Sequence, residues 1–226
     1  MKRTLVREVM TTTVVTASEA MPFRHLVALM HARDIGAVPV TGPERHVLGV
    51  VSNADLAARA AGLSAAMARP LLVNSRRRRE HRRTTARTAG ELMTAPAVTV
   101  APAATVGQAA LLMSRRHVGR LPVTCPRCGE LAGIVTRCDL LRVYLRPGEE
   151  IRAEIEAEVI PLVPGADPRS LTVAVCDGVV TIEGEVERRS AASGVVTAAQ
   201  QVEGVIGVDE HITYGFDDRY PSTSFS

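Results

Sequence analysis

Two short stretches of the sequence follow one pattern: GVVSNADLA at Gly49–Ala57 and GIVTRCDLL at Gly133–Leu141. Each begins with a glycine and two apolar residues, continues with Ser or Thr, and reaches Asp-Leu after two further residues. A pattern that recurs within one chain indicates an internal repeat. Repeats are identified first because they define the domain organisation.

The repeat extends upstream of both stretches. Matched positions lie 83 residues apart, as in Met10-Thr11 with Met93-Thr94, Val15-Thr16 with Val98-Thr99, and Pro39-Val40 with Pro122-Val123. One extra residue within CPRCGE moves the offset to 84 for Asp55 and Asp139. Each unit is about 50–60 residues long, which is short for an independent core, so the two units are expected to bury their faces against each other.

Apolar periodicity predicts the same elements in both units. The elements of the second unit are, in order, a strand (97–100), a helix capped by Thr105, two strands (119–124 and 131–136) and a helix that begins at Thr136. In the first unit, Gly62 is expected to end the last helix. The predicted order is strand–helix–strand–strand–helix.

Each unit resembles a CBS motif, named after cystathionine β-synthase, and the pair resembles a Bateman module. VMTTTVVT and LMTAPAVTV at the unit starts, the VPV and LPV strands and the repeated Gly-to-Asp pattern carry the resemblance, which covers 1–62 and 88–147. It implies an α+β fold of two pseudo-symmetric repeats packed as a pair. It also implies a non-catalytic homodimer that needs no cofactor and binds an adenine nucleotide of the AMP, ADP or ATP class as a regulatory ligand.

The end of each pattern admits two interpretations. Ser52 with Asp55, and Thr136 with Asp139, have the spacing of a helix N-cap and an acid three residues later. The same geometry can bind a ligand, because a helix N-terminus attracts phosphate and an Asp can accept both hydroxyls of a ribose. In CBS pairs this Asp holds ribose and the Ser or Thr approaches phosphate, so the resemblance favours the ligand site.

The two sites are not expected to be equal. Arg137 follows Thr136, and Arg120 precedes the LPV strand, whereas their counterparts are Asn53 and Ala37. The sequence therefore assigns more charge for phosphate to the Thr136 site. The resemblance places adenine between backbone strands. The predicted nucleotide-binding residues are Val15, Ser52, Asp55, Val98, Arg120, Thr136, Arg137 and Asp139.

A basic segment, 63–87, joins the two units as a linker. From Arg76 to Arg87 it holds seven Arg and one Glu. Such a run can be a solvated linker, a sequence-blind contact with phosphate or nucleic acid, or a segment that docks on an acidic surface. We expect the linker role. Nucleic acid is not a predicted partner, because no helix-turn-helix, zinc-finger or aromatic RNA-binding motif is present.

Four cysteines are present, and two of them form the CPRCG stretch, Cys125 and Cys128. This stretch resembles one knuckle of a zinc ribbon, but a structural zinc needs four ligands and no second CxxC exists. The thioredoxin-like context of a redox CxxC is also missing. We expect a tight turn with two reduced thiols and no metal, and keep Cys125 and Cys128 as the metal candidates.

The last third of the chain changes in pattern and charge. A helix with Ile151, Ile155 and Val159 on one stripe precedes a hairpin that turns at Asp177-Gly178 and ends at Gly184. RRSAASGVVTAAQQVEGV predicts a second helix and IGVDEHITYG a last strand. DGVVTIEGEV and VEGVIGVDEHI resemble a BON domain, a small module first noted in bacterial proteins, over 149–215. We expect the tail, 216–226, to be disordered.

Charge separates the two parts of the chain, because residues 1–148 carry +13 and residues 149–211 carry −9. The acidic part argues against adsorption to an anionic bilayer, so membrane contact is not favoured and an unidentified protein partner is expected for the BON domain. Aromatic residues make up 3% and Trp is absent, which excludes a base-stacking surface. The basic N-terminus lacks an apolar stretch behind it, so a cytoplasmic location is expected.

These observations predict a cytoplasmic sensor that binds an adenine nucleotide in its CBS pair and relays binding through the BON domain. The alternative is a stress-response adaptor that binds no ligand and contacts protein or lipid through BON. No Gly-rich phosphate loop, complete metal motif or His beside a nucleophile is present, so an enzyme is not predicted.

Overall fold

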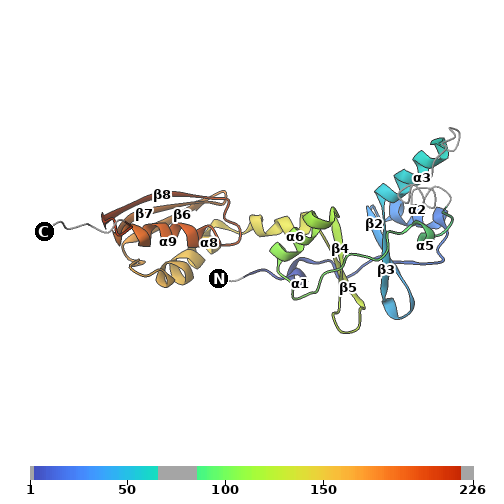
Figure 1. The fold of residues 1–226 in the computed structure, drawn as a ribbon, viewed down its shortest axis with the longest axis horizontal. Helices are drawn as coiled ribbons and strands as arrows, with labels where there is room; N and C mark the ends of the chain where they lie inside the picture. Colours follow the sequence, from blue (N-terminus) through green and yellow to red (C-terminus); the bar gives the residue numbers. More distant parts are fainter. Residues whose placement is uncertain (1–2, 66–85, 220–226) are drawn as a thin grey trace. The chain divides into compact units, whose positions relative to one another are not determined.

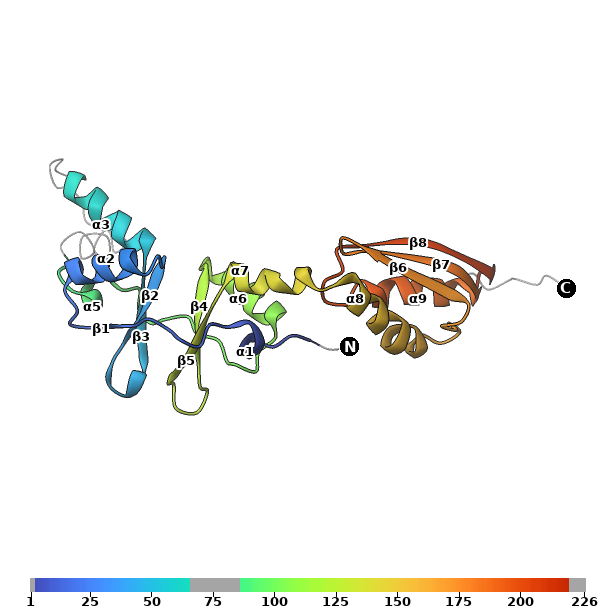
Figure 2. The same ribbon diagram turned by 180° about the vertical axis from the view of Figure 1, so that it is seen from behind.

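The computed structural model describes residues 3–65 and 86–219. The chain forms two compact units, one of Leu5–Asp139 and one of Met1–Thr4 with Leu140–Ser226. Figures 1 and 2 show both units from opposite sides. Within the described residues, no helix combines the length and apolar character that crossing a bilayer requires.

The first repeat builds a three-stranded sheet flanked by helices. Its elements are α1 (Val6–Val9), β1 (Ala17–Ser18), α2 (Phe23–Ala32), β2 (Ala37–Thr41), the 3₁₀ turn η1 (Pro43–Arg45), β3 (Val47–Ser52) and α3 (Asn53–Ala65). β2 pairs in parallel with β1 and antiparallel with β3. The buried core contains Leu26 and Met30 of α2, with Val38, Val40 and Val51 of the sheet.

The second repeat has the same order of elements. They are α5 (Ala89–Leu92), α6 (Val106–Arg116), β4 (Arg120–Thr124), β5 (Leu131–Thr136) and α7 (Arg137–Leu140). As predicted, Thr105 caps α6: its hydroxyl accepts from the Gln108 N–H at 3.2 Å, and the Gln108 side chain accepts from the Thr105 N–H at 3.0 Å. The strand predicted at 97–100 reduces to one bridge, in which Val100 lies parallel to Val123.

The two repeats exchange their first segments. Thr11, from the first repeat, pairs with Ile134 of β5 through two backbone hydrogen bonds of 2.9 Å. Thr94, from the second repeat, pairs with Val50 of β3 through bonds of 2.9 and 3.1 Å. Ala89 and Leu92 of α5 belong to the buried core of the first repeat. Each repeat therefore contributes a segment to the fold of the other repeat, as the short length of a single repeat predicted.

Glycine is required where the exchanged segments cross β3 and β5. A Cβ at Gly49 would lie 2.6 Å from the Met93 sulfur and 2.9 Å from the Thr94 carbonyl oxygen. A Cβ at Gly133 would lie 2.7 Å from the Met10 sulfur and 2.9 Å from the Thr11 carbonyl oxygen. The glycine that begins both sequence stretches therefore serves close packing of the two repeats.

The compact unit that begins again at Leu140 is a helix–hairpin–helix–strand domain. Its elements are the 3₁₀ turn η2 (Leu141–Leu145), α8 (Gly148–Glu154), the π-helical turn η3 (Ile155–Val159), the 3₁₀ turn η4 (Ile160–Leu162), β6 (Leu171–Cys176), β7 (Val179–Arg188), α9 (Arg189–Ala199) and β8 (Gly207–Phe216). β7 pairs antiparallel with β6 and parallel with β8. α8 contacts β6, and α9 contacts β7 and β8 (Figures 1 and 2). The predicted stripe of Ile151, Ile155 and Val159 is buried in this core.

Three predicted element ends differ from the structure. α3 passes through Gly62 and continues to Ala65. The helix that begins after Thr136 is α-helical for four residues and continues as the 3₁₀ turn η2. β7 does not stop at Gly184, because this residue stays paired with Leu171 and Ile212 while its φ of 137° absorbs a local distortion. At Gly184, strand pairing on both sides outweighs the local preference of glycine.

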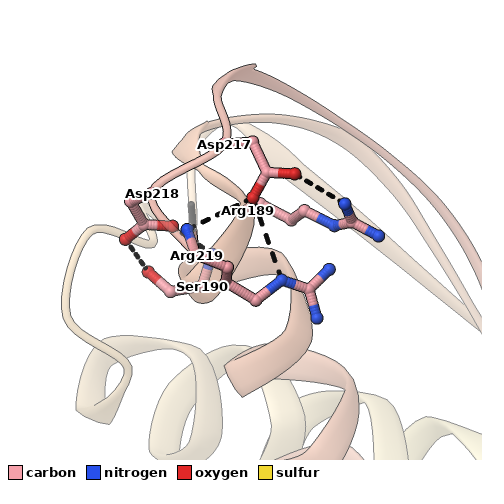
Figure 3. A network of polar contacts seen from close by, with 5 residues as sticks. All are labelled: Arg189, Ser190, Asp217, Asp218 and Arg219. Atoms are coloured by element: carbon pink, nitrogen blue, oxygen red, sulfur yellow. Dashed lines mark hydrogen bonds and ion pairs between the residues drawn. The ribbon is translucent and has the colours of Figure 1, made fainter. Parts of the chain in front are cut away.

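The expectation of a disordered tail from 216 was wrong for its first residues. Phe216 is the last residue of β8. The Asp217 carboxylate forms an ion pair with Arg189 at 2.6 Å, and Asp218 accepts the hydroxyl of Ser190 (Figure 3). The Ser190 hydroxyl also holds the pKa of Asp218 below its usual range. The tail residues thus dock on the start of α9. Most of the linker predicted at 63–87, including Arg76–Arg79, lies outside the described residues.

Candidate functional site

The first motif lies at the start of α3. The carboxylate of Asp55 accepts the Ser52 N–H at 2.9 Å and the Ser52 hydroxyl at 2.6 Å, both through Oδ2. Its Oδ1 accepts the hydroxyl of Thr94 at 3.4 Å. Asp55 is 5% exposed. Both oxygens of this carboxylate are therefore used inside the protein.

The second motif repeats the local geometry at the start of α7. The Oδ2 of Asp139 accepts the Thr136 N–H at 2.9 Å and the Thr136 hydroxyl at 2.7 Å. The Thr136 hydroxyl in turn accepts the Asp139 N–H at 3.4 Å. This reciprocal arrangement is a capping box with Asp in place of the usual Glu or Gln. The capping geometry is thus present in both motifs.

The carboxylates of Asp55 and Asp139 differ in the donors near their second oxygen, Oδ1. Asp139 is half-buried, and no group within 3–65 or 86–219 donates to its Oδ1. Thr11 holds the position in the repeat that Thr94 holds beside Asp55, but its hydroxyl makes no hydrogen bond to Asp139 among these residues. Oδ1 of Asp139 therefore has no donor among the described residues, whereas Oδ1 of Asp55 accepts one long hydrogen bond.

The contribution of Thr94 was not foreseen from the sequence. The match between Met10-Thr11 and Met93-Thr94 was visible, but a local pattern cannot tell which repeat receives each segment. Because the segments are exchanged, the hydroxyl of Thr94 reaches the motif of the other repeat.

Val15 and Val98 lie just before the points at which the chain enters each sheet. Both are half-buried. Two residues later, Ala17 pairs with Val40 and Val100 pairs with Val123. Among the described residues, no backbone hydrogen bond uses the N–H or C=O of Val15 or Val98. These peptide groups are able to bind the edge of a planar heterocycle.

The two arginines occupy different surroundings. Arg120 pairs with Thr136 through the β4–β5 ladder, but its side chain extends to the first repeat. A Cβ at Gly36 would lie 2.9 Å from Nη2 of Arg120 and 3.3 Å from Nδ2 of Asn53. Partial burial lowers the pKa of Arg120 by desolvation, although a guanidinium remains charged. This position differs from the sequence prediction, which assigned the charge of Arg120 to the Thr136 motif.

Arg137 folds back over the short connection between α6 and β4. Its Nη2 donates to the carbonyl oxygen of Val118 at 3.3 Å, and the side chain remains exposed. Since one weak hydrogen bond holds it, the guanidinium can turn toward an anion at the Thr136 end of α7.

The cysteine pair lies at the tip of the β4–β5 hairpin. The Cys125 N–H donates to Glu130 O at 2.9 Å, and the Gly129 N–H donates to Cys125 O at 2.8 Å, which closes the predicted tight turn. Among the described residues, no three His, Cys, Asp or Glu side chains gather into a group that could hold a metal ion.

A hollow of about 700 Å³ lies elsewhere, in the unit that contains α8 and α9. Its lining includes Asp167, Glu185 and Glu187. Three carboxylates repel phosphate, so this hollow is unsuited to a nucleotide.

Comparison with known proteins identifies both parts of the chain. The CBS domain model matches residues 6–62 and 89–146, and the BON domain model matches residues 148–215. No curated protein sequence matches the chain.

Solved CBS structures share the fold of the first part. CBSX2 in complex with AMP is 24% identical, with 63% of this chain and 96% of that chain covered and a TM-score of 0.50. The CBS domain pair of protein MJ0100, solved with 5′-methylthioadenosine and S-adenosyl-L-methionine, is 20% identical, with coverage of 62% and 99% and a TM-score of 0.50. A Vibrio cholerae protein named for acetoin utilization, AcuB, is 25% identical, with coverage of 64% and 94% and a TM-score of 0.50.

Proposed function

Since the chain belongs to the CBS-domain family and carries a C-terminal BON domain, we propose that it is a regulatory protein that binds an adenine nucleotide at the Thr136–Asp139 motif. AMP, ADP and ATP are the ligand class. The proposal includes no catalytic step, and it places the protein in the cytoplasm as a homodimer. The CBS pair is the sensor, and the BON domain contacts the protein partner.

The free Oδ1 of Asp139 is the observation that carries this proposal. A ribose offers two adjacent hydroxyl donors, and a half-buried carboxylate with an open oxygen can accept them. Thr136 and Arg137 lie at the same end of α7 and can approach the phosphate. The peptide groups of Val15 and Val98, one in each repeat, are the candidates for the adenine edge.

The ligands of the neighbouring structures agree with this class. CBSX2 is solved with AMP, and the MJ0100 pair with two ligands that each contain adenosine. Adenosine is the common part of these molecules, and a diol-binding Asp with free backbone groups recognises that part. Phosphate contacts of Thr136 and Arg137 would then distinguish a nucleotide from a nucleoside, whereas Arg120 extends to the first repeat.

Calorimetry of AMP and ATP binding tests the proposal. Loss of charged hydrogen bonds to the ribose is worth roughly 1.5–3 kcal/mol, or about ten- to a hundredfold in affinity. Asp139→Asn should therefore weaken binding by that factor. Asp55→Asn is the matched control and should weaken binding less. Equal affinities of the wild type and both variants would contradict the nucleotide assignment.

The proposed relay to the BON domain follows the chain beyond Asp139. Arg146 lies seven residues after Asp139, and its Nη2 forms a 2.9 Å ion pair with Glu154, whose side chain is 7% exposed. Nη1 of Arg146 donates to the carbonyl oxygen of Glu203 at 2.7 Å. The Glu203 carboxylate accepts the N–H of Thr4 at 2.8 Å. The chain leaves this unit at two places, after Thr4 and before Leu140. Glu203 binds Thr4 itself, and it binds Arg146, which follows Leu140 closely in the sequence.

Gly204 brings this loop into close contact with η2. A Cβ there would lie 2.9 Å from the Val143 carbonyl oxygen and 3.0 Å from Cδ1 of Ile151. A shift at Asp139 on ligand binding would pass through η2 to Val143, Arg146 and the Glu203 loop. Hydrogen exchange of residues 200–206 should change when AMP saturates the wild type, and not in Asp139→Asn. Unchanged exchange at saturating AMP would contradict the relay but not the binding site.

An adaptor without a ligand is the second candidate. The observation in its favour is that both Asp residues already complete capping interactions with Ser52 or Thr136. If AMP and ATP both fail to bind the wild type, contact with protein or lipid through the BON domain becomes the leading function.

A further inference from the structure

The Cys125–Cys128 turn is separate from the nucleotide site and has its own chemistry. Pro126, Arg127 and Cys128 form a hydrogen-bonded turn between β4 and β5. The Gly129 N–H donates to the Cys125 carbonyl oxygen at 2.8 Å, so residues 125–129 form one helix-like turn, in which residues three apart have Cα atoms roughly 5 Å apart. Disulfides usually join Cα atoms about 4.4–6.8 Å apart. The backbone therefore holds the two cysteines in the range in which a bond between them can form.

The side chains are also close enough to interact. The neighbouring Cys128 thiol and the backbone N–H groups of Cys128 and Arg127 lower the pKa of Cys125, and the Cys125 sulfur raises the pKa of Cys128. Cys125 is half-buried and Cys128 is exposed, so the turn is accessible to a small molecule.

The turn is supported from the first repeat. His46, at the end of the β2–β3 loop, forms a bridge with Glu130, the residue that accepts the Cys125 N–H. Nδ1 of His46 lies 3.1 Å from the ideal Cβ position of Gly129, whose φ is +69°. His46 thus contacts the turn at Gly129 and Glu130, next to Cys128.

We propose that Cys125 and Cys128 are a modification site, at which a small-molecule disulfide such as oxidised glutathione converts the two thiols into a reversible disulfide. The Cys125 thiolate attacks one sulfur of the oxidant, forms a mixed disulfide and releases one glutathione thiolate. The Cys128 thiolate then attacks the Cys125 sulfur and releases the second. Two electrons and two protons pass from the protein to the oxidant, which leaves as two reduced glutathione molecules.

The other cysteines provide internal controls. Cys138 in α7 and Cys176 in β6 are both exposed, and no second cysteine lies beside either of them in the sequence. They can form a mixed disulfide but have no neighbouring thiol to displace the glutathione.

Peptide mapping of the full chain after incubation with oxidised glutathione tests the site. The wild type should yield a peptide with a Cys125–Cys128 link, reversible by dithiothreitol, while Cys138 and Cys176 carry only glutathione. In Cys128→Ser, glutathione should remain on Cys125 and attach there about threefold faster, or more, than on Cys138 or Cys176.

Two results would overturn the proposal. One is a wild-type protein in which all four cysteines collect glutathione equally and no link forms. The other is stoichiometric zinc in the purified protein that blocks the link until a chelator removes it, which would assign the pair to metal binding. The mapping needs no variant, so a folding defect in Cys128→Ser would not affect the first result.

Discussion

The Ser52–Asp55 and Thr136–Asp139 motifs share a sequence pattern and a set of capping hydrogen bonds, but they differ in their neighbours. Asp55 is buried and uses both oxygens, one of them with Thr94 of the other repeat. Asp139 is half-buried and keeps Oδ1 open among the described residues. The comparison teaches that capping follows from local sequence, whereas the donors around the second carboxylate oxygen depend on the segment that the other repeat supplies.

The largest loss of stability is expected from substitutions of Gly49 and Gly133, the glycines that begin the two sequence stretches. The loss should be the same at both positions. Gly49→Ala and Gly133→Ala each place a Cβ within 2.9 Å of a backbone carbonyl oxygen of the exchanged segment. Overpacking of this kind costs about 1–3 kcal/mol, so urea denaturation should show a similar loss in both variants. Gly107→Ala in α6 is the control, because only Thr105 Oγ1 lies as near as 4.0 Å. A large difference between the first two variants would mean that the repeats do not pack alike.

The next effect should separate the motifs. Asp55→Ala removes a cap and a buried carboxylate that accepts three hydrogen bonds, so it should cost about 1–2 kcal/mol. Asp139→Ala exposes its donors to water and should cost about 0.5–1 kcal/mol. Unfolding free energies from urea titration of the ligand-free protein measure both. A greater loss at Asp139 would reverse the proposed division between a structural and a binding motif.

A smaller effect should come from the exchanged threonines. Thr94→Val removes a long hydrogen bond to Asp55 and should lower the unfolding free energy by about 0.5 kcal/mol. Thr11→Val is the matched change in the other repeat and should have no measurable effect, since its hydroxyl makes no bond to Asp139. Thermal melting of the two variants side by side provides the measurement. Equal losses would show that Thr94 does not distinguish the motifs.

The smallest effect on stability and binding is expected from changing the arginine run Arg76–Arg79, which lies between the two motifs in the sequence. Replacing Arg76–Arg79 with Ser should leave both the melting temperature and AMP affinity nearly unchanged, because a run of like charge adds nothing to a core. A drop of many degrees would show that the run docks on the protein. Unchanged stability with weaker AMP binding would instead assign these arginines to the phosphate.

Much of the fold could be predicted because the controlling signals are local and repeated. The spacing of Thr105 and Gln108 predicted a cap that the structure contains, and Asp177-Gly178 predicted the hairpin turn, where both residues have positive φ. Gly62 and Gly184 were misread as ends of elements. Glycine weakens a helix or strand by only about 1 kcal/mol, which neighbouring packing and pairing can offset.

The contacts of the tail residues and of the Arg120 side chain could not be predicted from the sequence, because their partners lie far away along the chain. Asp217 and Asp218 meet Arg189 and Ser190 only after β8 has paired with β7, so their partners lie 28 residues away (Figure 3). Arg120 is long enough to reach the first repeat, where Gly36 leaves room for its guanidinium. A single sequence does not reveal such distant neighbours.

By itself, the sequence determined the repeated CBS pattern, the BON domain and the residue types at each motif, because spacings of three residues and periodic apolar positions act within one element. The sequence also predicted unequal motifs, from the charges beside them, but only the tertiary structure decided which carboxylate oxygen has a donor. Both repeats exchange a segment, but among the described residues only the Thr94 hydroxyl donates to the Asp of the other repeat, at Oδ1 of Asp55, while no donor reaches Oδ1 of Asp139. The physical reason is that a carboxylate's free hydrogen-bonding capacity is set by whichever donors the fold brings within about 3 Å, wherever they lie in the chain.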